Sequence, residues 1–276
     1  MTKTLTTLLI ATLFMGLFSF LSKSKKTKEN PKSTILGMVL LEDPNSFSLT
    51  GTINELRNIW KLEVNDKDAD NDTAVLSING YQVAIAVIKM PIPNQEVESA
   101  ADYNYFWKSG ALEVANHKGH IIISILDTGK NDLHENIVFS QVTSAVLKNS
   151  QALGVYLGSR TLVLKKEFYL ENMDMMSESD LPIYNWVYFG LRQENGKQSV
   201  YTYGLSDFGK KEMEIVDSSK SLDELNEMMY NLTHYVIAFN VTLNDGETVG
   251  ITAEEKILIS ESKGRFLEGK TLKINY

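Results

Sequence analysis

The 276-residue sequence contains no cysteine. This absence excludes disulfide bonds, thiolate nucleophiles, cysteine metal sites and an amino-terminal cysteine modified by lipid. The sequence also lacks the G-x-S-x-G pattern that places a serine nucleophile on a sharp turn. We therefore predict no recognisable catalytic nucleophile and no cofactor.

Positive charge is scarce outside the amino-terminal segment. The chain has 27 basic and 35 acidic residues, and six of the lysines lie within residues 1–32. Beyond that segment, 21 basic residues face 34 acidic ones. Because nucleic-acid binding requires clustered basic side chains, we do not expect a nucleic-acid partner.

The longest apolar run lies near the amino terminus. It covers 17 uncharged residues from Leu5 to Leu21, close to the lower limit of about 17 for a membrane helix. A cluster of lysines follows it, whereas only Lys3 precedes it; the cluster is Lys23, Lys25, Lys26 and Lys28. Lysine-rich flanks favour the cytoplasmic side. We therefore predict a membrane anchor over residues 1–22, a basic linker over 23–33 and a cytoplasmic domain on a single-pass inner-membrane protein.

A cleaved signal peptide is the alternative for the same segment. It would export the protein to the periplasm, but a cleavage site needs small side chains. The corresponding region, Ser19–Ser22, contains Phe20 and Leu21 instead. This favours the retained anchor.

Residues 34–165 show strand and helix patterns in alternation. Apolar runs predict strands over 34–41, 73–77, 83–88, 119–126 and 154–164, and Asn79-Gly80 predicts a hairpin. Helices are expected from the Thr52-x-x-Glu55 capping pattern, over 96–108, and from Asp132 onward. Residues 166–182 read as a short helix and a connection. This order is typical of an α+β fold with mostly antiparallel strands and helices packed on one face.

Residues 183–276 form a second α+β region. Asn195-Gly196 predicts another hairpin, and Ser221 with Glu224 predicts a capping box at the start of a long helix. Apolar residues at steps of three and four continue this helix to Phe239. Short strands are expected at 212–216 and after Asp245-Gly246.

One loop has the spacing of a phosphate-binding loop. Residues 204–210 match G-x-x-x-x-G-K, but the next residue is Lys211 rather than serine or threonine, and 212–216 alternates like a strand. We therefore interpret the segment as a glycine-containing loop between strands.

Two groups of residues are weak candidates for metal binding. Alternating aspartates resemble a calcium loop but lack its glycine and its glutamate; they are Asp66, Asp68, Asp70 and Asp72. His117 and His120 are a close histidine pair, although a catalytic zinc needs a third protein ligand. We predict no metal, with these residues as the positions to test.

The carboxyl-terminal half resembles a known family. Trp186–Leu191 (WVYFGL), 201–215 (YTYGLSDFGKKEMEI) and 245–250 (DGETVG) are similar to the bacterial DUF4261 family, most specifically over 183–262. The motif positions in this sequence are Gly204, Phe208, Gly209, Glu212, Glu214, Gly246 and Gly250. The resemblance implies a mainly cytosolic family without established catalytic residues, and some relatives among secretion and toxin-immunity genes.

These observations lead to two functional hypotheses. The first is a membrane-tethered, non-catalytic module that binds an unidentified protein partner, in an immunity-like or secretion-associated role. The alternative is a hydrolase or metal-dependent enzyme with a site near His117 and His120.

Overall fold

The structure is a computed structural model that describes residues 34–66, 69–177, 179–250 and 256–276. Thr34–Tyr276 form one compact unit. None of the helices in these ranges is long and apolar enough to cross a membrane. The predicted anchor and basic linker lie outside the described residues.

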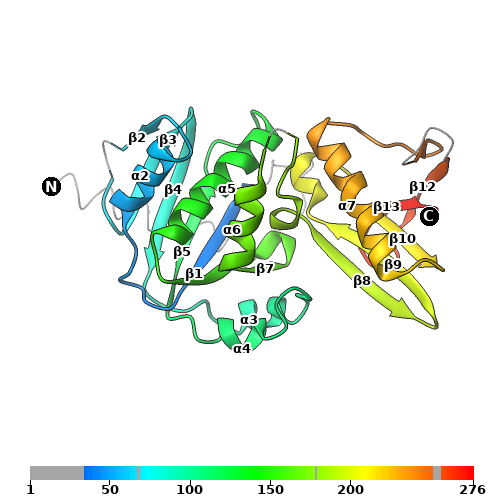
Figure 1. Ribbon diagram of the computed structural model, residues 1–276, viewed down its shortest axis with the longest axis horizontal. Helices are drawn as coiled ribbons and strands as arrows, with labels where there is room; N and C mark the ends of the chain where they lie inside the picture. Colours follow the sequence, from blue (N-terminus) through cyan, green and yellow to red (C-terminus); the bar gives the residue numbers. More distant parts are fainter. Residues whose placement is uncertain (1–33, 67–68, 178, 251–255) are drawn as a thin grey trace. The chain divides into compact units, whose positions relative to one another are not determined.

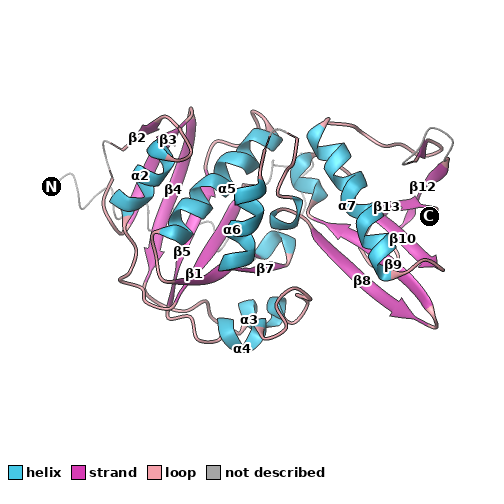
Figure 2. Cartoon of the chain, viewed as in Figure 1, coloured by secondary structure: helices cyan, strands magenta, loops and turns pink. Residues whose placement is uncertain are grey.

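The first sheet has seven antiparallel strands (Figures 1 and 2). In spatial order they are β2 (Val64–Asn65), β3 (Thr73–Ile78), β4 (Tyr81–Ile88), β5 (Gly119–Ile125), β1 (Leu36–Leu41), β6 (Ala152–Leu157) and β7 (Leu162–Lys165). The predicted Asn79-Gly80 hairpin is confirmed: both residues have positive φ, as a tight turn between twisted strands requires.

Helices cover both faces of the first sheet. One face packs against α2 (Leu49–Asn58), α5 (Asp132–Lys148) and α6 (Lys166–Met175), which share a core with Val39 and Val155. Successive residues of a strand point to opposite faces. Tyr156, next after Val155, donates its hydroxyl hydrogen to Glu96 at 2.7 Å, and Glu96 begins α3 (Glu96–Ala101).

The expectation of helices on one face is therefore wrong for this sheet. α3 and α4 (Gly110–Val114) lie on the face opposite α5 and α6, where Trp107 packs against Gly154. The reason is visible in β5, whose seven residues are all buried, so that both of its faces need a cover. We call residues 89–118, which carry α3 and α4, the α3–α4 insert.

The second sheet has six strands, in the order β11 (Thr248–Val249), β12 (Ile257–Lys263), β13 (Lys270–Ile274), β10 (Met213–Ser218), β9 (Lys197–Tyr203) and β8 (Tyr188–Glu194). Its pairs are antiparallel except for β10 and β13, which run parallel. α7 (Leu222–Ala238) covers one face and shares a core with Val200 and Ile215. The predicted Ser221–Glu224 capping box and the Asn195-Gly196 hairpin are both confirmed.

α5 connects the two cores. Val138 and Phe139 belong to the first core, while Leu133 and Ile137 pack against the second. This explains why most of the helix is buried rather than a single stripe. The predicted mixed fold with antiparallel sheets is thus confirmed, with six α-helices among the described residues.

Candidate functional site

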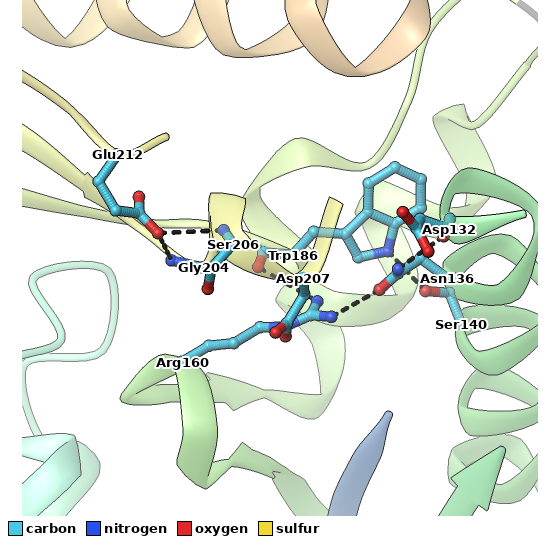
Figure 3. A network of polar contacts seen from close by, with 9 residues as sticks. All are labelled: Asp132, Asn136, Ser140, Arg160, Trp186, Gly204, Ser206, Asp207 and Glu212. Carbon is cyan, nitrogen blue, oxygen red and sulfur yellow. Dashed lines mark hydrogen bonds and ion pairs between the residues drawn. The ribbon is translucent and has the colours of Figure 1, made fainter. Parts of the chain in front are cut away.

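The loop with phosphate-loop spacing holds a carboxylate of its own chain. Residues 205–208 form a short 3₁₀ turn, η3 (Leu205–Phe208), directly after β9. The amides of Gly204 and Ser206 donate to Oε1 of Glu212 at 2.9 and 3.3 Å (Figure 3). The Thr202 hydroxyl donates to Oε2 of the same carboxylate at 2.7 Å. The carboxylate thus occupies the position in which a phosphate would accept hydrogen bonds from such amides. The loop is therefore closed internally, as a glycine loop between strands.

Burial affects the ionisation of this carboxylate. Removal from water raises the pKa of Glu212, and the hydrogen bonds from Thr202, Gly204 and Ser206 lower it only in part. The net shift is upward. Glu212 therefore exchanges a proton at higher pH than an exposed glutamate does.

A buried arginine attaches this loop to the first sheet. Arg160 lies in η1 (Gly158–Arg160), between β6 and β7, and is 2% exposed. Its Nε donates to Oδ2 of Asp207 at 2.7 Å, its Nη1 to the carbonyl oxygen of Trp186 at 3.2 Å, and its Nη2 to Oδ1 of Asn136 at 2.7 Å (Figure 3). The guanidinium thus contacts α5, the segment before β8 and the loop after β9.

Aromatic side chains enclose the same contact. The indole Nε1 of Trp186 donates to the Ser140 hydroxyl at 2.7 Å, and its ring lies 5.5 Å from the ring of Phe208. The Arg160 guanidinium lies 5.6 Å from the Phe208 ring centroid, within the range of a cation–π contact. Phe208 and Trp186 therefore shield the polar contact from water. We call Arg160, Asn136, Ser140, Trp186 and Asp207 the polar latch.

Two glycines make this geometry possible. Gly204 has φ +122°, and a Cβ there would lie 3.0 Å from the Trp186 carbonyl oxygen. Gly209 ends the turn with φ +66°, and a Cβ there would lie 3.7 Å from the Asp132 carboxylate. The motif glycines thus serve the turn and its close approach to neighbouring backbone and side chains.

Glu214 also holds backbone amides of a loop, on the face of the second sheet that points away from α7. Its side chain is fully buried, pairs with Lys273 at 2.9 Å and accepts the amides of Arg265 and Phe266 at 2.9 and 3.1 Å. Burial acts to raise its pKa, but these amides and Lys273 outweigh burial and lower it. Phe266 then stacks on Tyr201, with ring centroids 5.3 Å apart. The β12–β13 loop is therefore held against this face.

A third glutamate closes the loop before α5. Glu135 is 2% exposed, and its Oε1 accepts the amides of Gly129, Lys130 and Asn131 at 2.7, 2.7 and 3.0 Å. The buried Glu135 and Glu214 and the partly buried Glu212 thus each hold backbone amides of a loop. In all three places, the groups that could bind an external anion are already used.

The histidine pair is buried, and His117 has both ring nitrogens engaged. Its Nε2 accepts the Ile92 amide at 2.8 Å, and its Nδ1 lies 2.6 Å from the Val114 carbonyl oxygen. The Nδ1 of His120 lies 3.0 Å from the Met90 carbonyl oxygen. Burial lowers the pKa of His120. His117 therefore has a structural role: it connects the beginning of the α3–α4 insert, at Ile92, with its end.

The aspartates of residues 66–72 do not form a common binding site among the described residues. Asp66 pairs with Arg57 at 3.0 Å and Asp72 with Lys89 at 3.1 Å. The amide of Asp70 bonds to the Thr73 carbonyl oxygen, and Asp68 lies outside the described residues. Across the ranges that the structure describes, no group of three or more metal-binding side chains occurs.

The remaining motif glycines lie in the turn region before β12. Gly246 has φ +81°, with no atom within 4 Å of the place where a Cβ would lie. Its amide bonds to the Ile259 carbonyl oxygen at 2.9 Å. Gly250 is exposed and directly precedes residues outside the described ranges.

The comparisons support the family assignment of this segment. Residues 201–275 match the family model described as a domain of unknown function, DUF4261. This confirms the resemblance, although the matched segment begins later and ends later than predicted. No curated protein and no solved structure matches the chain. The matched segment contains the loop, Glu212, Glu214 and most of the second sheet.

Sequence reasoning missed Arg160. Arg160 contacts residues 24 to 47 positions away, which no local pattern connects. The spacing of Asp132 and Glu135 did predict a helix start, but the structure has Asn131 as the N-cap, and Glu135 accepts the amides of the loop before it.

Proposed function

We propose that residues 34–276 form a non-catalytic protein-binding module that residues 1–22 tether to the inner membrane, with the module on the cytoplasmic side. The proposal extends the resemblance to a family with immunity-like and secretion-associated relatives, and the acidic charge favours a basic partner surface.

The observation that carries the proposal is the exposed apolar surface of the α3–α4 insert. Met90, Tyr103, Phe106 and Leu112 are 65%, 53%, 46% and 78% exposed. These are four of the eleven large apolar side chains that are exposed among the described residues, within one insert. Exposed apolar and aromatic side chains are enriched in protein-interaction sites.

Side-chain contacts attach the insert to neighbouring elements. The ring of Phe106 stacks on Phe168 at 4.8 Å and meets Tyr184 edge-on at 5.1 Å. Asn104 donates from its side chain to the Val163 carbonyl oxygen, which attaches the same turn to β7. A preorganised aromatic loses little entropy on binding. This supports recognition by shape.

Site-specific photocrosslinking in cells tests the binding role. A photoreactive residue at position 112 or 103 of the full-length protein is expected to form an adduct of one defined mass. The matched control is position 59, where the side chain is 61% exposed but outside the insert. L112D should suppress the adduct formed from position 103. Identical adducts from position 59, or none from the insert, would refute the proposal.

Fusions after Tyr276 test the tether and its direction. Green fluorescent protein is expected to fluoresce and alkaline phosphatase to remain inactive, because the module lies in the cytoplasm. Active phosphatase would establish export instead. Stoichiometric zinc in the purified protein, lost in H120A, would support the metal-enzyme alternative over the binding module.

A further inference from the structure

A cavity of about 480 Å³ lies on the second sheet, and none of its lining residues belongs to the α3–α4 insert. Its twelve lining residues come from the start of β9, the end of β10 with the connection to α7, β12, the β12–β13 loop and the end of β13. Ten of them fall within the segment that matches the family model. The volume is in the range of about 300–1,000 Å³ found for small-molecule sites.

The cavity concentrates positive charge on an acidic protein. Four of its twelve lining residues are basic, against 27 of 276 in the whole chain; they are Lys197, Lys220, Arg265 and Lys273. The one acidic side chain among them is Asp217. Hydroxyl groups of Ser219 and Ser260 add further polar atoms, whereas the Ser218 hydroxyl donates to the Tyr276 carbonyl oxygen at 2.9 Å. The lining therefore has the chemistry of an oxyanion site.

Three of the basic groups are free enough to contact a ligand. Lys273 is held by the buried Glu214 at 2.9 Å and has a structural task. The Nζ of Lys220 lies 5.1 Å from the ring centroid of Tyr276, and Lys220 and Arg265 form long ion pairs of 3.6 and 3.7 Å with side chains that are about half exposed or more. Such surface pairs contribute about 0–1 kcal/mol, so a ligand can displace or share them. Lys197 is exposed.

The place in the fold is also favourable. β10 and β13 are parallel neighbours, and the cavity lies where both strands end. The pairing of β10 with β9 is irregular between Ile215 and Ser218, and Asp217 has φ +53°. Bulges of this kind are frequent beside binding sites, because they redirect side chains.

The start of α7 lies beside the cavity, but its amides do not form the site. Ser221 and Glu224 already cap them in a reciprocal pair. Recognition therefore rests on the basic side chains and hydroxyl groups.

We propose that this cavity binds a small, multiply charged oxyanion, a phosphate ester or a polycarboxylate, through Lys197, Lys220 and Arg265. Val216 and the ring of Tyr276 supply an apolar wall for the rest of the molecule.

Calorimetric titration of the full-length protein with pyrophosphate and, separately, with citrate tests this assignment. One saturable site is expected, with an affinity that falls as salt is added. If only pyrophosphate binds, the ligand is assigned as a phosphate ester; if only citrate binds, it is assigned as a polycarboxylate. Binding of both probes would support an oxyanion site that accepts either class. K197A and R265A should each weaken binding about tenfold.

The matched control is K108A, which removes an exposed lysine of the α3–α4 insert. It should bind as the unchanged protein does. Binding of neither probe, or binding that K197A and R265A leave intact, would overturn the assignment. Because the protein-binding proposal uses other residues and another measurement, either can fail alone.

Discussion

Nε of Arg160 lies 2.7 Å from Oδ2 of Asp207, and both side chains are nearly withdrawn from water, with 3% and 12% of their surface exposed. The ion pair connects the turn between β6 and β7 with the loop after β9. Because the other guanidinium nitrogens bond to Asn136 and Trp186, this arginine holds the two sheets in one arrangement. The polar latch therefore attaches the segment that matches the family model, through Asp207, to the first sheet.

Replacing Arg160 should destabilise the protein strongly. R160M leaves the Asp207 carboxylate and the Asn136 side chain without their arginine partner, and breaking a buried pair in this way costs about 3–5 kcal/mol. Urea unfolding of the full-length protein measures the loss. The control is R57M, which removes the exposed Arg57–Asp66 pair and should cost less than about 1 kcal/mol. Equal losses in the two variants would show that the latch contributes nothing particular.

Gly204 and Gly246, two of the motif glycines with positive φ, should differ in their tolerance to asparagine. Gly204 has φ +122° and ψ −4°, outside the left-handed helical region, and its Cβ position lies 3.0 Å from the Trp186 carbonyl oxygen. G204N should therefore cost about 1–3 kcal/mol. Gly246 has φ +81° and open space around it, so G246N should cost less, because asparagine tolerates such turns. The thermal unfolding midpoints of the two variants test this prediction, and equal midpoints would contradict it.

Glu212 and Glu214 should make opposite contributions to the pH dependence of stability. The pKa of Glu214 is lowered in the folded state, so its stabilisation is present above the ordinary value of 4.5 and is lost as pH falls below it. The pKa of Glu212 is raised, so the folded state binds more protons and its contribution decreases as pH rises from 4.5.

Unfolding midpoints between pH 3 and 7 test both signs. Relative to the unchanged protein, E214Q should lose less stability on acidification, and E212Q should lose less as pH rises above 4.5. E227Q is a suitable control, because that glutamate is exposed on α7 and lies outside the capping box. If E212Q and E214Q shift the profile in the same direction, the assignment of the two environments is wrong.

Local patterns predicted the elements better than their ends. The hairpins at Asn79-Gly80 and Asn195-Gly196 were predictable because two adjacent residues with positive φ determine the turn. The capping pattern at Thr52 was misplaced: α2 begins at Leu49, because the Ser48 side chain accepts the Gly51 amide at 3.1 Å. Ser48 competes with Thr52 for the same role, and periodicity does not distinguish them.

Tertiary contacts decided what the patterns left open. Residues 96–108 were expected to be one helix, but α3 ends at Ala101, and Asn104 bonds to the Val163 carbonyl oxygen on β7. The cavity was also unpredictable, because the parallel pairing of β10 with β13 brings together residues 59 positions apart, such as Met213 and Leu272. Recognition of the family identified Glu212 and Glu214 without their roles, which depend on the amides that surround each carboxylate.

His120 should make the protein less stable in mild acid. Burial lowers its pKa below the ordinary 6.5, and the neighbouring His117 lowers it further, against the hydrogen bond to Met90. Since the unfolded chain then binds more protons, stability falls as pH decreases from 6.5 and levels off below the folded-state pKa. H120Q should flatten this part of the profile, whereas H134Q, at an exposed position on α5, should keep it. Chemical unfolding at several pH values between 5 and 7.5 measures the slopes, and an unchanged slope in H120Q would show that another group titrates there.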